Sequence, residues 1–224
     1  MQNESSTSIE TLKKFNAECP FCQTNAITDF VMKETPNFRL VADHAPLLEG
    51  HLLIIPKQHY TCYGDVPASL DDELLEIKQE VEHFFKLNYV EPIYWEHGIF
   101  HQTVFHAHLH CFPIGPLTHT DKLDDRGQLV YGQEQIRSWH LDKGKYFYLG
   151  DAQRGWIFPP EADDYSFIVK NELGPMVTAH SKYKHWRLPQ ERQIDGKPLI
   201  ASVIQKWQAF QELDFQHSKQ PHND

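Results

Sequence analysis

The sequence predicts an α+β fold in which an antiparallel sheet is flanked by helices. Apolar, β-prone runs at 38–42 and 52–55 are separated by a turn-prone stretch, and residues 93–95 and 104–112 indicate further strands. Ahead of the last two strands, residues 69–88 place apolar side chains at helical spacing. Short strands joined by turns, with one long helix inserted, are typical of an antiparallel α+β layer.

Local signals bound these elements. Pro56 ends the second strand, because proline cannot donate a hydrogen bond to a sheet ladder. Ser69 and Asp72 form a capping-box pattern at the start of the helix. Pro113 and Gly115 follow the last strand and end it.

The chain divides into two blocks. We expect a main domain over 17–115, then a linker or mobile loop over 116–140, which is rich in Gly, Asp and Gln. A smaller C-terminal α+β extension is expected over 141–215. Because this extension offers little core of its own, we expect it to pack on the main domain.

Three elements are expected in the extension. Residues 145–158 predict a hairpin with a long turn. Residues 164–173 predict a short helix closed by Gly174 and Pro175, and residues 198–213 predict an amphipathic helix with a broad apolar side.

Charge and composition exclude several classes of partner. The net charge of the 224-residue chain is −10, and no Lys/Arg stripe is present, so long nucleic acid is not expected as a partner. A small nucleotide can still bind in a local pocket of imidazoles and backbone amides. The polar start of the sequence and its four cysteines predict a cytoplasmic protein without a membrane span or a disulfide framework.

The most informative segment is an alternating row of histidines. His106, His108 and His110 fall on one face if the segment is a strand, while Phe105 and its alternate neighbours to Cys111 face the core. Imidazole titrates near pH ~6.5, so such a row can hold a neutral nucleophile beside protonated neighbours. The alternative without a function is that a chain with 15 histidines places three of them on a strand by chance.

Two motifs resemble those of one family. The segment 102–113, Gln-Thr-Val-Phe-His-Ala-His-Leu-His-Cys-Phe-Pro, resembles the signature strand of the histidine triad superfamily. The segment 50–59, Gly-His-Leu-Leu-Ile-Ile-Pro-Lys-Gln-His, resembles the family's other hallmark. The resemblance covers about residues 17–115 and implies a histidine triad fold, an antiparallel sheet with flanking helices that is often paired into a homodimer.

The resemblance also implies a role for each matched residue. His108 would be the nucleophile that forms a nucleotidyl-histidine intermediate at the α-phosphate, with His110 and His106 assisting. Four residues would bind the nucleotide: Gln102, Thr103, Asp43 and His51. As an alternative, Asp43 is simply a turn residue.

One segment departs from the common pattern of the family. Many members have glycine-rich sequence before the glutamine, whereas residues 95–101 read Trp-Glu-His-Gly-Ile-Phe-His. This segment resembles a less characterised branch that carries a C-terminal extension. The resemblance therefore implies a nucleotide hydrolase or nucleotidyl transferase without fixing the leaving group.

A cysteine pair predicts a structural zinc site. Cys19 and Cys22 have the spacing from which two thiolates can hold one tetrahedral zinc ion, with a redox pair as the rival interpretation. Some histidine triad proteins and the related galactose-1-phosphate uridylyltransferases resemble this arrangement, and the matching later ligands here are His59 and His106. No organic cofactor is expected.

Two other functions remain open on the sequence alone. In the first, His106, His108 and His110 hold a catalytic metal. Against it, side chains two residues apart on a flat strand do not converge on one point as three ligands of one metal ion must. In the second, the cleft is a non-catalytic module that binds a nucleotide or a partner protein.

Overall fold

One antiparallel sheet organises the molecule. The computed structural model describes residues 18–117, 120–182 and 188–218. Its strands lie in the order β1-β2-β3-β5-β4-β7-β8-β6, and every neighbouring pair in this order is antiparallel. The strands are β1 (Val31–Glu34), β2 (Phe38–Ala42), β3 (Leu52–Pro56), β4 (Pro92–Glu96), β5 (Leu109–Pro113), β6 (Gln128–Val130), β7 (Phe147–Gly150) and β8 (Gly155–Phe158).

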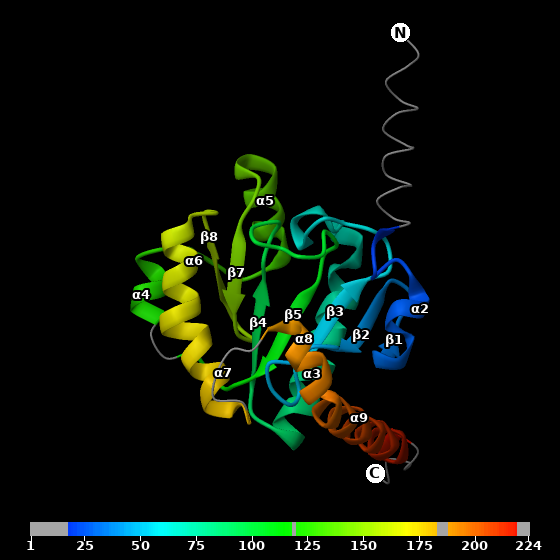
Figure 1. The fold of residues 1–224 in the computed structure, drawn as a ribbon. Helices are drawn as coiled ribbons and strands as arrows, with labels where there is room; N and C mark the ends of the chain where they lie inside the picture. Colours follow the sequence, from blue (N-terminus) through cyan, green and yellow to red (C-terminus); the bar gives the residue numbers. More distant parts are fainter. Residues whose placement is uncertain (1–17, 118–119, 183–187, 219–224) are drawn as a thin grey trace, which may run out of the picture.

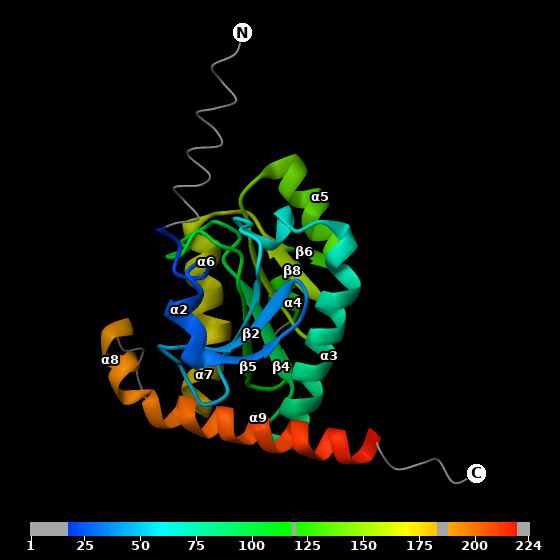
Figure 2. The same cartoon turned by 90° about the vertical axis from the view of Figure 1, so that its right-hand side faces the viewer.

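Helices cover both faces of this sheet (Figures 1 and 2). The α-helices are α2 (Thr24–Ile27), α3 (Asp71–Asn88), α4 (Thr120–Asp124), α5 (Gln133–Lys143), α6 (Ala162–Ile168), α7 (Gly174–His180), α8 (Pro189–Asp195) and α9 (Lys197–Ser218). Side chains of α3, α5 and α9 share one core with the strands, and side chains of α6 and α7 share the other. The expected α+β class is therefore confirmed.

Strand β5 shows how the two faces are divided. Leu109 and Cys111 belong to the core that contains α3 and α9, while Phe112 belongs to the core that contains α6 and α7. Successive residues of a strand point to opposite faces, so His110 shares the face of Phe112. The rings of His110 and Phe112 stack at 5.8 Å, which agrees with that placement.

Several sequence expectations match the described elements. The strands at 38–42 and 52–55, the hairpin at 145–158 and the last helix correspond to β2, β3, β7–β8 and α9. Residues 151–154 form the hairpin turn, in which the Asp151 side chain accepts hydrogen bonds from the backbone N–H groups of Gln153 and Arg154.

The expected linker or loop at 116–140 is wrong for most of its length. It contains α4, β6 and the first part of α5, and β6 pairs with β8 at the edge of the sheet. Asp124 ends α4, Asp125 and Gly127 lie in the turn before β6, and Gly132 precedes α5, which accounts for much of the loop-like composition. Strand β7 pairs with β4, so the second block extends the same sheet.

Two other boundaries also differ from expectation. The helix expected at 164–173 does not close at Gly174, because residues Val169–Leu173 form a wider π-helical turn that leads directly into α7. Pro175 lies in the first turn of α7, where its missing N–H breaks no α-helical ladder. The capping box expected from Ser69 is absent, since α3 begins at Asp71 after a 3₁₀ turn.

The expected strand at 104–112 begins only at Leu109, so His106 and His108 precede it in irregular backbone. Phe105 was expected to anchor this strand in the core, and this is wrong because the side chain is 53% exposed. The alternation still holds for Ala107, Leu109 and Cys111, which are all buried.

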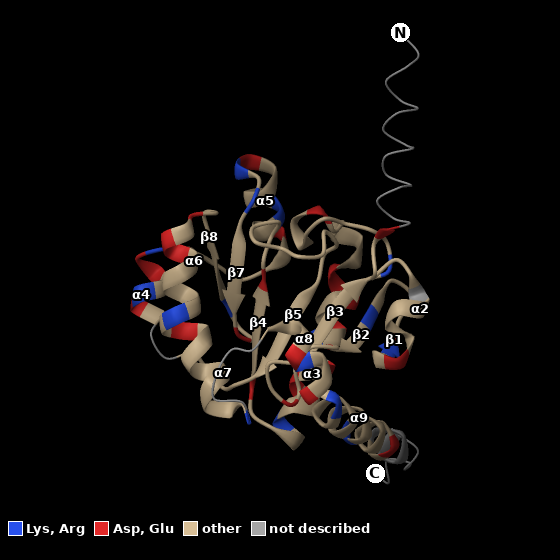
Figure 3. Cartoon of the chain, in the orientation of Figure 1, with Lys and Arg blue, Asp and Glu red and all other residues tan. Residues whose placement is uncertain are grey.

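The charged side chains lie mainly on helices and loops (Figure 3). In the described part of the chain, Figure 3 marks Lys and Arg positions interspersed with Asp and Glu positions along the ribbon. No helix within the described ranges is long and apolar enough to cross a bilayer.

A buried carboxylate joins the two blocks. Glu96 on β4 accepts hydrogen bonds from the Tyr63 backbone N–H (2.7 Å) and from the hydroxyl of Tyr146 (2.7 Å), which follows α5. The Tyr146 hydroxyl in turn accepts a hydrogen bond from the Gly64 N–H at 2.9 Å. Burial raises the pKa of Glu96 to about 7. Glu96 therefore connects β4, the 63–65 turn and the extension.

We predict that Glu96→Gln will change how stability depends on pH. A carboxyl whose pKa rises from 4.5 to about 7 on folding destabilises the native state progressively as pH increases between those values, and the effect is constant above them. The unfolding free energy of the variant minus that of the wild type should therefore increase by up to about 3 kcal/mol between pH 4.5 and 8. Urea denaturation of both proteins across this range measures this difference, and a pH-independent difference would contradict a raised pKa.

Candidate functional site

A cluster of sulfur and nitrogen atoms lies beside the histidine row. The side chains of Cys19, Cys22, His59 and His106 bring one ligand atom each within 4.8 Å of one another. The Cys19 Sγ lies 3.4 Å from His106 Nδ1, and the Cys22 Sγ lies 3.3 Å from His59 Nδ1 and 3.5 Å from His106 Nδ1. Residues 87 positions apart in the sequence thus meet in one cluster.

The spacing of this cluster fits a tetrahedral zinc ion. Zn–S bonds of about 2.3 Å and Zn–N bonds of about 2.0–2.1 Å at tetrahedral angles place sulfur and nitrogen roughly 3.5 Å apart. The sulfur–nitrogen distances of 3.3–3.5 Å in the cluster are close to that value. Burial and the neighbouring Cys19 raise the pKa of the Cys22 thiol to about 12, so a bound cation is needed to hold the Cys22 sulfur as a thiolate.

His106 is oriented on both sides of its ring. Its Nε2 lies 2.8 Å from the carbonyl oxygen of Pro56, an acceptor, so Nε2 carries the proton and donates it. The lone pair is then on Nδ1, which faces the sulfurs of Cys19 and Cys22. A hydrogen bond from the far ring nitrogen to a carbonyl oxygen fixes the tautomer of a metal-binding histidine in this way.

The surroundings of His108 select one tautomer of its neutral ring, the one with the proton on Nδ1. Its Nδ1 lies 2.7 Å from the carbonyl oxygen of His106, so Nδ1 carries the proton and the lone pair is on Nε2. The ring is buried, and the ring of Phe21 contacts it edge-on at 5.4 Å. The arrangement leaves Nε2 as the one nucleophilic atom of this side chain.

His110 presents a proton where His108 presents a lone pair. The Leu47 backbone N–H donates to His51 Nδ1 at 3.3 Å, so the His51 proton is on Nε2. His51 Nε2 lies 2.9 Å from His110 Nδ1 and donates to it, which leaves the His110 proton on Nε2. The rings of His108 and His110 are 5.0 Å apart, so a ring with a protonated Nε2 lies next to a ring with an Nε2 lone pair.

Asp43 supports this histidine pair from the β2–β3 loop. One carboxylate oxygen accepts the Ala45 N–H at 2.7 Å, and the other lies 3.5 Å from His51 Nε2. Both interactions are local, as expected for a turn residue, yet the side chain also lies within reach of the predicted nucleotide site.

The extension secures the same loop from the far side. Ser181 donates its hydroxyl to the carbonyl oxygen of Leu47 at 2.7 Å, and Arg192 donates its Nε–H to the carbonyl oxygen of Ala45 at 2.8 Å. These two residues were missed by sequence reasoning, because nothing in a single sequence links positions 134 or more residues apart.

Gln102 is engaged with backbone rather than directed into open space. Its side-chain oxygen accepts the Ile99 N–H at 3.1 Å, and its amide nitrogen donates to the carbonyl oxygens of Thr61 and His106 at 3.2 and 2.8 Å. Gln102 thus holds the same His106 carbonyl that orients His108. Thr103 lies elsewhere, on a hollow of about 260 Å³ beside the cysteine and His59 side chains.

The turn before the row adds a residue that the sequence left undecided. Trp95 donates its Nε1–H to His97 Nε2 at 3.3 Å, so the His97 proton is on Nδ1, which lies 3.2 Å from the Phe100 carbonyl oxygen. Both ring nitrogens are satisfied, and the ring packs 5.8 Å from that of His110. The backbone here is strained, with φ of 77° at Ile99.

Burial keeps this site neutral. It lowers the pKa of His51, His97 and His106 to about 4, and it lowers the pKa of His108 and His110 as well. The expected mixture of neutral and protonated rings is therefore absent in the ligand-free protein. A phosphate anion in the site would favour the protonated form of the nearest imidazoles and raise their pKa values.

The row does not converge on a single point. Each ring of the row has its own partners. The His106 ring contacts the Pro56 carbonyl and the cysteines, the His108 ring contacts a main-chain carbonyl, and the His110 ring contacts His51. Within the described residues, none of the clusters suited to a metal contains all three. The geometry disfavours a three-histidine catalytic metal.

We predict opposite tautomers for the two neighbouring rings. In a long-range ¹H–¹⁵N correlation spectrum of the ligand-free protein, His108 should show a protonated Nδ1 and His110 a protonated Nε2, because their hydrogen-bond partners require it. Each residue is the internal control for the other. A protonated Nε2 on neutral His108 would contradict the proposed availability of its lone pair.

Comparisons with known proteins agree with this geometry. The model of the HIT domain family matches residues 24–116. Adenosine 5'-monophosphoramidase HNT1 of Saccharomyces cerevisiae is 27% identical over 166 residues, which cover 70% of this chain and 92% of the relative. The protein of the same name from Candida albicans is 29% identical over 108 residues, covering 44% and 71%.

Among solved structures, a Zn-bound histidine triad family protein from Mycobacterium smegmatis is 28% identical, with 44% of this chain and 76% of that chain covered and a TM-score of 0.39. The histidine triad nucleotide-binding protein from Candida albicans is 27% identical, with coverages of 48% and 91% and a TM-score of 0.36. The two motifs, the HIT-domain match and the HNT1 relatives give the family. The chain carries a HIT domain and through it belongs to the histidine triad superfamily.

Proposed function

We propose that this protein hydrolyses a nucleotide derivative at its α-phosphate, with His108 as the nucleophile. The observation that carries the proposal is the fixed tautomer of His108, whose Nδ1–H is held by the His106 carbonyl and whose Nε2 lone pair is free to attack. The neighbouring His110 Nε2–H supplies a hydrogen-bond donor for a non-bridging oxygen of the phosphate.

The proposed reaction has two displacements. In the first, His108 Nε2 forms a bond to phosphorus as the bond to the leaving group breaks, and the leaving group departs with the bonding electron pair and takes up a proton. In the second, water attacks phosphorus and releases a proton, which replaces the one taken up by the leaving group, while the P–N bond breaks and its electron pair returns to Nε2. If an acceptor hydroxyl replaces water, the same intermediate makes the protein a nucleotidyl transferase.

The relatives suggest which substrate to test first. Two of them are named as adenosine 5'-monophosphoramidases, so an adenosine phosphoramidate, in which the leaving group is an amine, is the first candidate. The nucleotide-binding roles of Asp43, His51, Gln102 and Thr103 and the pairing of the chain into a homodimer stay predictions of the resemblance.

We further propose that Cys19, Cys22, His59 and His106 hold a structural zinc ion. The carrying observations are the sulfur–nitrogen spacing and the orientation of His106 by Pro56. When bound, zinc would supply a positive charge that holds both sulfurs as thiolates and ties the start of the domain to the catalytic segment. The rival is a non-catalytic binding module, which the free His108 lone pair disfavours.

We predict that His108→Ala will lose at least about 10³-fold in turnover of an adenosine phosphoramidate, because the substitution removes the attacking atom. Folding should be retained, since Ala107 and Leu109 on either side of His108 still anchor the segment in the core. The matched control is His180→Ala, an exposed histidine on α7. Steady-state kinetics with circular dichroism tests this, and near-normal turnover by a folded His108→Ala protein would refute the role.

We predict about one zinc ion per chain in protein purified without added metal, and its loss in the double variant Cys19→Ser, Cys22→Ser. The matched control is Cys111→Ser, because Cys111 is buried but lies outside the cluster. Elemental analysis gives the metal content. Wild-type protein with no zinc and with both cysteines rapidly alkylated in the native state would overturn the site.

A further inference from the structure

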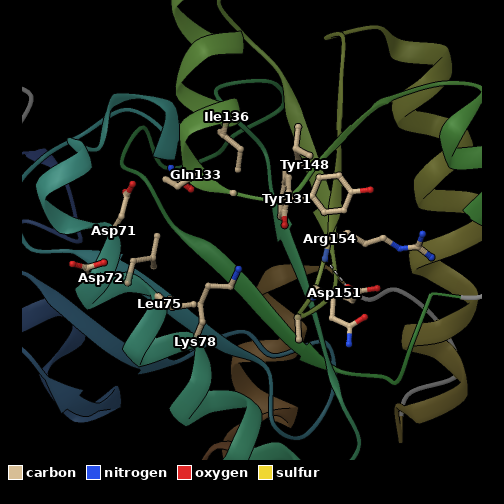
Figure 4. Close-up of a pocket in the computed structure, with 15 residues that line it drawn as sticks. Asp71, Asp72, Leu75, Lys78, Tyr131, Gln133, Ile136, Tyr148, Asp151 and Arg154 are labelled. Atoms are coloured by element: carbon tan, nitrogen blue, oxygen red, sulfur yellow. Dashed lines mark hydrogen bonds between the residues drawn. The ribbon is translucent and has the colours of Figure 1, made fainter.

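A second cavity lies on the opposite face of the sheet from the histidine row. It encloses about 250 Å³ between α3, the β6–α5 connection and the β7–β8 turn (Figure 4). Tyr94 and Trp95 are consecutive on β4 and belong to the two different cores. Trp95 contacts His97 on the histidine side, while Tyr94 lies beneath Lys78, which lines the cavity. The sheet therefore separates the two sites.

Lys78 is the cation at the base of this cavity. Its ammonium lies 4.4 Å from the centre of the Tyr94 ring, and Figure 4 shows it reaching from α3 toward the middle of the lining residues. Among the described residues, no carboxylate oxygen lies close enough to the Lys78 ammonium, 4.0 Å or less, to form an ion pair. Burial lowers the pKa of Lys78, as expected for an ammonium that lacks a close counter-ion.

Of the three carboxylates that line the cavity, those of Asp71, Asp72 and Asp151, two have close partners of their own. Asp71 forms a two-pronged ion pair with Arg137, at 2.7 and 2.6 Å, so its charge is largely offset. Asp151 accepts two backbone N–H groups within the hairpin turn. An anion that reaches Lys78 therefore gains a partner that the protein itself does not supply.

The walls of the cavity are suited to a flat apolar group. Tyr131 and Leu75 line it from different elements, and their side chains are 69% and 53% exposed. Large apolar side chains with this exposure lose water when a planar ring packs between them. Gly132 adds open space, because a Cβ placed there would meet no atom within 4 Å.

We propose that this cavity binds a small organic carboxylate that carries a planar apolar group, with the carboxylate paired to Lys78 and the ring packed against Tyr131 and Leu75. The cavity of about 250 Å³ holds a molecule of one or two fused rings rather than a whole nucleotide. The cavity is thus a second binding site, separate from the proposed α-phosphate site.

The test uses 2-naphthoate as the probe and 2-naphthamide as its neutral match, titrated into the full chain and followed by calorimetry and by amide NMR shifts. We expect saturable binding of 2-naphthoate, at least about tenfold weaker binding of the amide, and a loss of at least about tenfold in Lys78→Met. Lys86→Met is the matched control, because Lys86 lies on the same helix and pairs with Glu82 at the surface.

Two further variants locate the site. Gly132→Met should weaken 2-naphthoate binding by filling the cavity, and its extended φ of −161° accepts any side chain. His108→Ala should leave binding unchanged, which separates this proposal from the proposed hydrolase activity. Absence of saturable binding, equal binding by folded Lys78→Met and Gly132→Met proteins, or loss of binding in His108→Ala would each overturn the proposal.

Discussion

The hydrogen bond from His108 Nδ1 to the His106 carbonyl oxygen, 2.7 Å long, fixes which ring nitrogen would attack phosphorus in the proposed reaction. That carbonyl is itself held, since the Gln102 amide donates to it at 2.8 Å. The His106 ring is also committed, with Nε2 bonded to Pro56 and Nδ1 facing the cysteines. A single residue thus links the zinc-type cluster to the orientation of the nucleophile, so movement of the N-terminal cysteines would be transmitted to His108.

Burial shapes the chemistry as strongly as geometry does. Imidazoles in a desolvated row have lowered pKa values, and the ligand-free site is therefore a set of neutral rings with alternating donors and lone pairs. The free-energy cost of keeping these rings buried beside a phosphate site is small, because no charged imidazole has to be desolvated. The C-terminal block contributes to this order in two ways. Ser181 and Arg192 hydrogen-bond to the loop that leads to His51. Tyr146, through Glu96, holds the turn next to Thr61, whose carbonyl oxygen accepts a hydrogen bond from Gln102.

The sequence revealed those parts of the structure that depend on local pattern. Alternation identified the buried Ala107, Leu109 and Cys111. The spacing of Cys19 and Cys22, with the family resemblance that added His59 and His106, gave one zinc-site hypothesis, and the four side chains do lie together. It failed where long-range pairing overrides composition, as in the 116–140 segment, whose β6 is a strand only because β8 lies beside it. Tautomers, the strain at Ile99 and the contacts of Arg192 depend on three-dimensional neighbours and leave no signal in one sequence.

The most direct test of the central claim is the stereochemical course at phosphorus. Each in-line displacement inverts the configuration, so a reaction through a nucleotidyl-His108 intermediate, which contains two displacements, should proceed with overall retention. The measurement uses an adenosine phosphorothioamidate of defined configuration at the α-phosphorus, hydrolysed in ¹⁸O-labelled water, with product configuration assigned by ³¹P NMR. Retention is the predicted result. Inversion would show direct attack by water and would contradict a covalent role for His108.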